Sequence, residues 1–199
     1  MLSLSKLWLA YAPFFNPVQD CFNGDFWIVF EKKFGKFGNN QKVIDLASGT
    51  GELRNHINPK KYIGIDLNKY YILYARSNFK DTKDLFLIGD ITKYDLPKNF
   101  DTAFLISAAH HLSDHSLGKL SKRIKKCGVK NLIVIDGNPR GMLSGILSWL
   151  DRVLGGGKYF RSEREIAKIL SKDLEVETIG RFKARRSFYD YPYVYLTNK

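Results

Sequence analysis

Short apolar runs alternate with amphipathic stretches along most of this 199-residue chain. Strands and helices that follow one another in this way are typical of a parallel sheet covered by helices on both faces. The sequence therefore predicts an α/β fold with a doubly wound, mostly parallel, seven-stranded sheet and an antiparallel last strand. The expected strands are Lys42–Leu46, Tyr62–Asp66, Leu85–Gly89, Thr102–Ser107, Leu132–Asp136, Leu174–Ile179 and Tyr193–Thr197. The expected helices are Val18–Phe34, Glu52–Ile57, Lys69–Asn78, Ser116–Lys126 and Ser162–Ser171.

Composition narrows the class of protein further. The length suits a single domain over residues 1–199, and 44% hydrophobic with 26% charged residues suits a soluble core. The two cysteines, Cys21 and Cys127, match neither a disulfide framework nor a zinc site. We therefore expect no metal, reduced thiols and a cytoplasmic location, with a peripheral membrane position as the alternative.

The net charge of +12 favours acidic partners: nucleic acid, an anionic membrane surface or a phosphorylated substrate. Most lysines are scattered, as on an ordinary solvated surface. Arg181, Lys183 and Arg185 would share one face of a strand, where they would bind phosphate or protect a sheet edge. Because aromatic and basic residues are not interleaved as in RNA readers, nucleic acid is the less favoured partner.

Polar side chains stand at the carboxyl ends of the first five expected strands. Asp45, Asp66, Asp90 and Asp136 lie in or next to four of these ends, and Ser107 ends the remaining strand. In open parallel sheets, ligands bind beyond the carboxyl ends of the strands. A core strand has no structural reason to end in an acid, so the pattern indicates a polar ligand at this edge.

The stretch VIDLASGTGEL places a glycine-rich turn after the first strand. Gly49 and Gly51 permit positive φ and remove side chains where a ligand approaches the backbone. The helix expected next would favour an anionic group at its N-terminus. Asp66, 21 residues after Asp45, suits a carboxylate that accepts hydrogen bonds from ribose hydroxyls. A dinucleotide-binding protein would share these features, but Arg54 stands where its pattern needs a third glycine, and the chain leaves no room for a separate catalytic domain.

The ordered segments VIDLASGTGEL, YIGIDLN, LFLIGDIT and FDTAFLISAAHHL resemble the class I S-adenosylmethionine-dependent methyltransferases over residues 40–140. The resemblance implies S-adenosylmethionine as cofactor, with the Asp45–Gly51 loop around its methionine part. It also implies Asp66 at the ribose, Asp90 with Ile91 at the adenine, and Ser107 near the methyl group. In the family loop a glycine stands at the position of Ala47, so this loop is slightly more hindered. The expected cofactor-binding residues are Asp45, Ala47, Ser48, Gly49, Gly51, Asp66, Leu67, Asp90, Ile91 and Ser107.

A later stretch, DRVLGGGKYFRSEREIAKIL, resembles a subgroup of small bacterial and archaeal methyltransferases whose substrates are mostly unassigned. This resemblance implies a small-molecule, sugar-linked or lipid-linked acceptor. Ser162 and Glu165 also predict a capping box, so Lys158–Arg161 forms either a helix entry or a substrate contact. We expect residues 1–40 to form a helical lid, 41–140 the cofactor-binding half and 141–199 the substrate-side half. The aromatic residues from Leu7 to Phe15 would belong to the lid, and the apolar segment Gly141–Leu154 would form core, lid or a membrane contact.

His110 and His111 follow the fourth strand, beside the expected methyl group. A neutral imidazole there would take a proton from a hydroxyl acceptor, so both are candidate catalytic residues; the alternative is a structural role. Asp114 is expected to cap the next helix. Two other functions stay open: methylation of RNA or protein, and a non-catalytic relative that only binds the cofactor.

Overall fold

The computed structural model of the protein describes residues 21–139 and 157–198. The expected N-terminal lid residues Leu7–Phe15 and the apolar segment Gly141–Leu154 lie outside these ranges. Within them, no helix is long and apolar enough to cross a membrane. The strands are β1 (Lys42–Leu46), β2 (Lys61–Asp66), β3 (Leu85–Ile88), β4 (Thr102–Ile106), β5 (Asn131–Ile135), β6 (Asn138–Pro139), β7 (Glu175–Lys183) and β8 (Tyr189–Thr197). The helices are α3 (Phe26–Phe34), α4 (Lys69–Asn78), α5 (Asp114–Cys127) and α7 (Glu163–Leu170), with short 3-10 turns η1 (Gly35–Phe37), η2 (Glu52–His56) and η3 (Ala109–His111).

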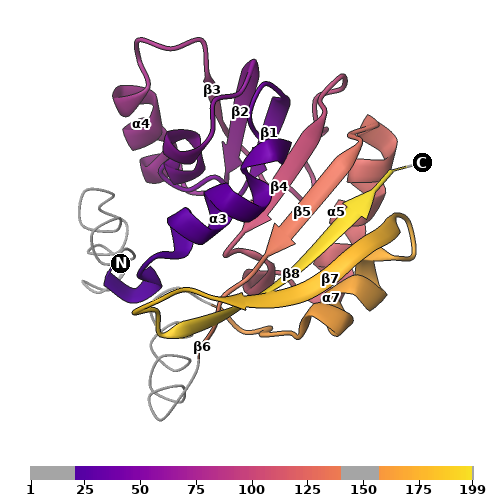
Figure 1. The fold of residues 1–199 in the computed structure, drawn as a ribbon. Coiled ribbons are helices and arrows are strands. Elements are labelled where there is room, and N and C mark those ends of the chain that lie inside the picture. Colours follow the sequence, from indigo (N-terminus) through magenta and orange to yellow (C-terminus); the bar gives the residue numbers. More distant parts are fainter. Residues whose placement is uncertain (1–20, 140–156, 199) are drawn as a thin grey trace, which may run out of the picture.

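The strands form one sheet in the order β3-β2-β1-β4-β5-β8-β6, with β7 paired to β8 (Figure 1). Strands β1 to β5 are parallel, whereas β8 runs antiparallel to both β5 and β7. This arrangement confirms the predicted doubly wound sheet with an antiparallel last strand. The additional strand is β6, a two-residue pairing with β8 that the sequence did not predict.

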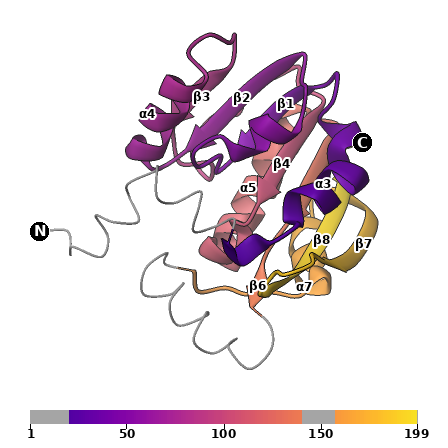
Figure 2. The ribbon, with the colours of Figure 1, turned by 60° about the vertical axis from the view of Figure 1, so that its left-hand side comes forward.

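Helices cover both faces of the sheet because the inner strands are apolar on both sides. On one face, α5 and α7 pack on Ile44, Leu105 and Val134. On the other, α3 and α4 pack on Val43, Phe104 and their neighbours. Figure 2 shows the two helical layers with the sheet between them.

The order of the sheet creates a crevice at its carboxyl edge. Strand β2 pairs with one side of β1, and β3 lies beyond β2. The next strand, β4, pairs with the other side of β1. Leu46 at the end of β1 pairs with Leu105 of β4, so the loops that follow these two strands start side by side. The direction in which strands are added to the sheet reverses at this point, which is where ligands bind in open α/β sheets.

Two of the expected helices are wrong in extent. The helix expected over Val18–Phe34 is interrupted within the described residues, because Gly24 has φ +54° and lies against the backbone of Arg185. A Cβ on Gly24 would lie 2.1 Å from the Arg185 carbonyl oxygen, so only glycine fits there. The helix expected over Glu52–Ile57 is the 3-10 turn η2, and the chain is already extended at Ile57. This short turn offers no helix dipole to an anion.

Three local expectations have different outcomes. The capping box of Ser162 and Glu165 is present at the start of α7, as predicted. The cap of α5, however, is Ser113 and not Asp114, which is the first residue of the helix. The basic residues expected on one strand face are also split, because β7 ends at Lys183, before Arg185, and Arg181 forms an ion pair with Glu163.

Candidate active site

The loop after β1 follows a left-handed path. Ala47, Gly49 and Gly51 all have positive φ, at +58°, +54° and +84°. For an alanine this conformation costs about 1–2 kcal/mol, because its Cβ crowds the following carbonyl oxygen. The glycine that the family has at this position would avoid that strain. Backbone hydrogen bonds from Ser48 to Ile65 and from Gly51 to Ser48 hold the loop against β2.

The two glycines of this loop have different roles. Open space lies above Gly49, where an added Cβ would meet nothing within 4 Å. Gly51 instead faces the core, where a Cβ would lie 2.9 Å from the rings of Phe79 and Phe86. Gly49 therefore borders the crevice, whereas Gly51 is required by packing and by its own φ. Packing against Phe79 and Phe86 is thus a second reason for glycine at Gly51, and its part in cofactor binding stays a prediction.

Asp66 lies at the end of β2 and is tied to this loop. Its carboxylate accepts the N–H of Gly49 at 2.8 Å and the N–H of Asn68 at 2.7 Å. Burial raises the pKa of Asp66, and these backbone hydrogen bonds partly offset the rise. These backbone contacts do not use all of the about four lone-pair sites of a carboxylate, so Asp66 can still accept a hydrogen bond from a ligand hydroxyl.

Asp45, the acid before the loop, is buried inside β1. The hydroxyl of Tyr62 donates to its carboxylate at 2.5 Å. Burial raises the pKa of Asp45 to about 7, with the Tyr62 hydrogen bond acting in the opposite direction. The described contacts of Asp45 are thus those of a core residue under the loop, and its part in cofactor binding stays a prediction.

The remaining predicted adenine and ribose residues are spread over the ends of β2 and β3. Leu67, 72% exposed, directly follows Asp66 and offers an uncovered apolar surface. Asp90 accepts hydrogen bonds from the N–H and hydroxyl of Thr92, and the hydroxyl contact is the main cause of its lowered pKa. Ile91 is buried in the core, so only its backbone is available to a ligand.

At the end of β4, a histidine and an aspartate meet across two strands. Ser107 turns the chain with φ +51°, and η3 follows it. His110 is 7% exposed, and its Nδ1 lies 2.6 Å from Oδ1 of the fully buried Asp136, which follows β5. Phe160 stacks on the His110 ring with an interplanar angle of 8°. His111 is exposed, and its ring centroid lies 4.1 Å from that of His110.

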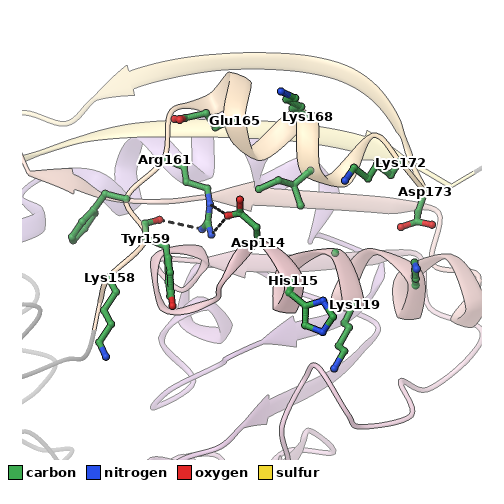
Figure 3. Close-up of a pocket in the computed structure, with 14 residues that line it drawn as sticks. Asp114, His115, Lys119, Lys158, Tyr159, Arg161, Glu165, Lys168, Lys172 and Asp173 are labelled. Atoms are coloured by element: carbon green, nitrogen blue, oxygen red, sulfur yellow. Dashed lines mark hydrogen bonds and ion pairs between the residues drawn. The ribbon is translucent and has the colours of Figure 1, made fainter.

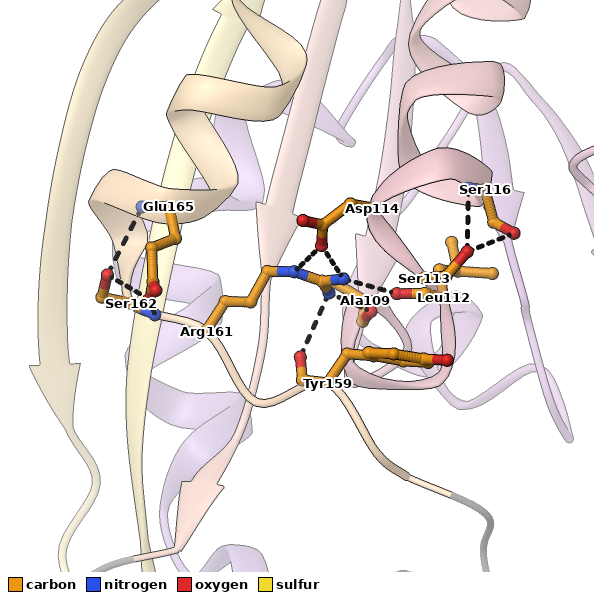
Figure 4. A network of polar contacts seen from close by, with 9 residues as sticks. All are labelled: Ala109, Leu112, Ser113, Asp114, Ser116, Tyr159, Arg161, Ser162 and Glu165. Carbon is orange, nitrogen blue, oxygen red and sulfur yellow. Dashed lines mark hydrogen bonds and ion pairs between the residues drawn. The ribbon is translucent and has the colours of Figure 1, made fainter.

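Arg161 fixes the η3 segment to its surroundings (Figure 4). Its guanidinium, although only 6% of the residue is exposed, contacts Asp114 Oδ1 at 2.6 and 3.0 Å. It also donates to the carbonyls of Ala109, Leu112 and Tyr159 at 2.8–3.1 Å. The backbone N–H groups of Lys158 and Tyr159 both bond to the carbonyl oxygen of His110. Of the two interpretations of Lys158–Arg161, these contacts support the entry to α7.

Sequence reasoning missed three residues of this arrangement: Asp136 as the partner of His110, Phe160 and Arg161. Asp136 was visible as one of the acids at the strand ends, but its partner depends on how β4 and β5 align. Phe160 and Arg161 were expected in a helix entry or a substrate contact, since nothing local in the sequence indicates their contacts with η3.

Comparisons with known proteins agree with this fold. Residues 43–130 match the family described as "Methyltransferase domain". No curated protein sequence matches the chain. A putative methyltransferase of Haloferax volcanii, solved with the Trm112 methyltransferase activator, has a TM-score of 0.72 at 15% identity over 100% of this chain and 99% of that one. A S-adenosylmethionine-dependent methyltransferase from Aquifex aeolicus has a TM-score of 0.65 at 20% identity, over 92% of this chain and 94% of that one. Magnesium protoporphyrin IX methyltransferase from Synechocystis, with bound S-adenosylhomocysteine, has a TM-score of 0.60 at 17% identity, over 91% of this chain and 83% of that one.

The residues at the crevice fit S-adenosylmethionine. The space above Gly49 accommodates a ligand against the loop, and the unused acceptor capacity of Asp66 suits a ribose hydroxyl. Among the described residues, the buried hydroxyl of Ser48 has no hydrogen-bond partner. With the methyltransferase-domain match over residues 43–130 and the fold, these features support a S-adenosylmethionine-dependent methyltransferase. Its cofactor is S-adenosylmethionine.

Replacing Asp66 by alanine is expected to weaken S-adenosylmethionine binding by about 1–3 kcal/mol, because charge-assisted hydrogen bonds to the ribose are lost. Calorimetry on the full chain measures the affinity. The matched control is Asp95→Ala, which removes an exposed acid that pairs with Arg123. Unchanged affinity in Asp66→Ala, or preferential binding of NADH, would contradict the assignment of Asp66.

Asp45 predicts a dependence of stability on pH. Its folded pKa of about 7 lies above the unfolded value of 3.8, so its contribution is fully present only below the unfolded pKa and is lost as the pH rises from there through 7. Asp45→Asn keeps an acceptor for Tyr62 without a charge. The stability of this variant relative to the native chain is expected to rise by about 2 kcal/mol between pH 5 and pH 8. Urea unfolding at both pH values measures it, and a constant difference would show that Asp45 is ionised in the fold at both.

Proposed function

We propose that the protein methylates a hydroxyl of a small-molecule, sugar-linked or lipid-linked acceptor, with His110 as the general base. S-adenosylmethionine supplies a methyl group already activated on a sulfonium, so the protein has to align the acceptor, exclude water and remove a proton. The observation that carries this proposal is the buried His110–Asp136 pair at the carboxyl edge, next to the turn at Ser107.

The pair is suited to proton transfer. A carboxylate only accepts hydrogen bonds, so Nδ1 of His110 carries the proton that lies toward Asp136. The other ring nitrogen, Nε2, then holds the lone pair that a base requires. Asp136 would also stabilise the imidazolium formed when His110 takes the acceptor proton. Phe160 packs flat on the ring and limits its rotation.

A comparison of His111 with His110 supports the choice of His110 as the base. The side chain of His111 is exposed, whereas that of His110 is buried against Asp136 and Phe160. A solvent-exposed imidazole is less rigidly positioned, which makes it a weaker candidate for the base. Of the two histidines expected from the sequence, His110 is therefore the one we propose.

Methyl transfer from labelled S-adenosylmethionine to fractionated cell extract tests the acceptor class. The full chain is incubated with lipid, small-molecule, RNA and protein pools, and label is expected in the lipid or small-molecule pool. Because the Haloferax volcanii neighbour was solved with an activator, unfractionated extract is included as a source of an activating partner. Label in RNA or protein alone would contradict the acceptor class. Cofactor binding without label in any pool would favour a non-catalytic relative.

A further inference from the structure

A basic groove runs between α5 and α7, on the face of the sheet that these helices cover (Figure 3). Its volume is about 870 Å³. The segment Lys158–Arg161 closes one end, and the ion pair of Arg161 with Asp114 joins the two walls. We call this the α5–α7 groove.

Lysines line the α5–α7 groove from both walls. Lys119 and Lys122 come from α5, Lys168 and Lys172 from α7 and the turn after it, and Lys158 from the closed end. Elsewhere in the described residues, three lysines form salt bridges with acids: Lys93, Lys126 and Lys130. Across the described residues, none of the five groove lysines has an acid within ion-pair distance.

The acids of the groove are occupied by other groups. Asp114 binds Arg161, and Glu165 accepts from the backbone N–H and the hydroxyl of Ser162. Asp173 accepts the hydroxyl of Ser121 at 2.6 Å. These neutral donors hold Glu165 and Asp173 in place but leave them charged. Because five lysines and Arg161 face three carboxylates, the groove still keeps an excess of positive charge.

The fold gains nothing from this arrangement of charge. Lys119 and Lys122 are three residues apart and Lys168 and Lys172 four apart, so each pair lies on one face of its helix or final turn. Like charges at these spacings are mildly destabilising. Low-dielectric walls also concentrate such a field, which attracts anions. An anionic ligand would relieve the repulsion.

The closed end of the groove lies next to His110. The N–H groups of Lys158 and Tyr159 bond to the His110 carbonyl, and Phe160 stacks on its ring. The chain segment that ends the groove is thus the one that holds the proposed base. A molecule anchored in the groove would have one end close to the carboxyl edge of the sheet.

We infer that the α5–α7 groove binds a phosphate-bearing ligand and thereby anchors the anionic part of the acceptor. The anchoring role rests on the proposed function, whereas phosphate binding does not. Lysine is a compact charge that suits phosphate oxygens. The volume is that of a site for a small molecule or a lipid headgroup, and the cations enclose a groove instead of following an extended stripe. These features favour a small phosphorylated group over RNA.

The test measures binding of inorganic pyrophosphate to the full chain by calorimetry at low salt. Lys119→Gln/Lys122→Gln and Lys168→Gln/Lys172→Gln are each expected to raise the Kd at least about tenfold, since each removes two charge-assisted contacts. Glutamine has nearly the helix propensity of lysine, so folding is preserved. The control Lys80→Gln/Lys83→Gln makes the same change in charge in the turn before β3 and is expected to leave the Kd within about twofold. An equal loss in the control and groove variants would show nonspecific attraction and overturn the inference.

Two further measurements identify the source of the phosphate. Vesicles of phosphatidic acid in phosphatidylcholine are compared with phosphatidylcholine alone in a sedimentation assay. Groove-dependent binding to the first indicates a lipid-linked phosphate, and pyrophosphate binding without vesicle binding indicates a soluble one; both support the inference. Groove-dependent binding of single-stranded RNA without pyrophosphate binding would overturn it. Calorimetry with S-adenosylmethionine on the same variants separates failure of the groove from failure of the methyltransferase assignment.

Discussion

Replacing Arg161 by alanine is expected to lower the free energy of unfolding by about 3–5 kcal/mol, because several backbone carbonyls lose their donor. The guanidinium is the common partner of three carbonyls, those of Ala109, Leu112 and Tyr159. The contact with Ala109 is buried and the other two are part-buried, and each carbonyl that water does not reach costs about 1–3 kcal/mol. Asp114 adds less, because its side chain is 74% exposed and remains hydrated. Urea unfolding followed by circular dichroism measures the loss.

Two further variants serve as comparisons for this loss of stability. Arg181→Ala removes an arginine that pairs with Glu163 on the surface, where an ion pair contributes about 0–1 kcal/mol. Arg161→Lys keeps a charge but reaches fewer acceptors than a planar guanidinium, so an intermediate loss is expected. If Arg161→Ala were no more destabilising than Arg181→Ala, the η3 segment would be held by other contacts.

The sheet was predictable because its strands are apolar on both faces. Neighbouring residues such as Val43, Ile44 and Leu46 are all buried, so each inner strand appears in the sequence as a continuous apolar run bounded by turns. The helices were less predictable where tertiary contacts decide their ends. Gly24 stops a helical pattern because the Arg185 backbone lies against it, and Arg185 is distant in sequence.

The site was predictable in its outline and not in its pairings. Every acid at a strand end was visible in the sequence, since the carboxyl ends of parallel strands share one edge. Whether an acid faces a ligand or a neighbour depends on strand register. The pairing of Ile106 with Ile135 brings the segments after β4 and β5 together, and so His110 meets Asp136. In the same way, the register of β1 and β2 brings Tyr62 to Asp45, a contact that the sequence does not reveal, and the part of Asp45 in cofactor binding stays a prediction.

His110→Asn is expected to lower turnover by roughly a hundredfold or more, the usual contribution of a general base, while the affinity for S-adenosylmethionine stays unchanged. The asparagine amide keeps a donor for Asp136, so the pair is preserved in shape but has no basic nitrogen.

Asp136→Asn is expected to lower turnover as well, because His110 would no longer be held in the tautomer with the lone pair on Nε2. His111→Ala serves as the control, with turnover close to that of the native chain. These rates are measured on the acceptor pool that takes up label. Native turnover in His110→Asn, or an equal loss in His111→Ala, would rule out His110 as the base and leave its pair with Asp136 as a structural contact between β4 and β5.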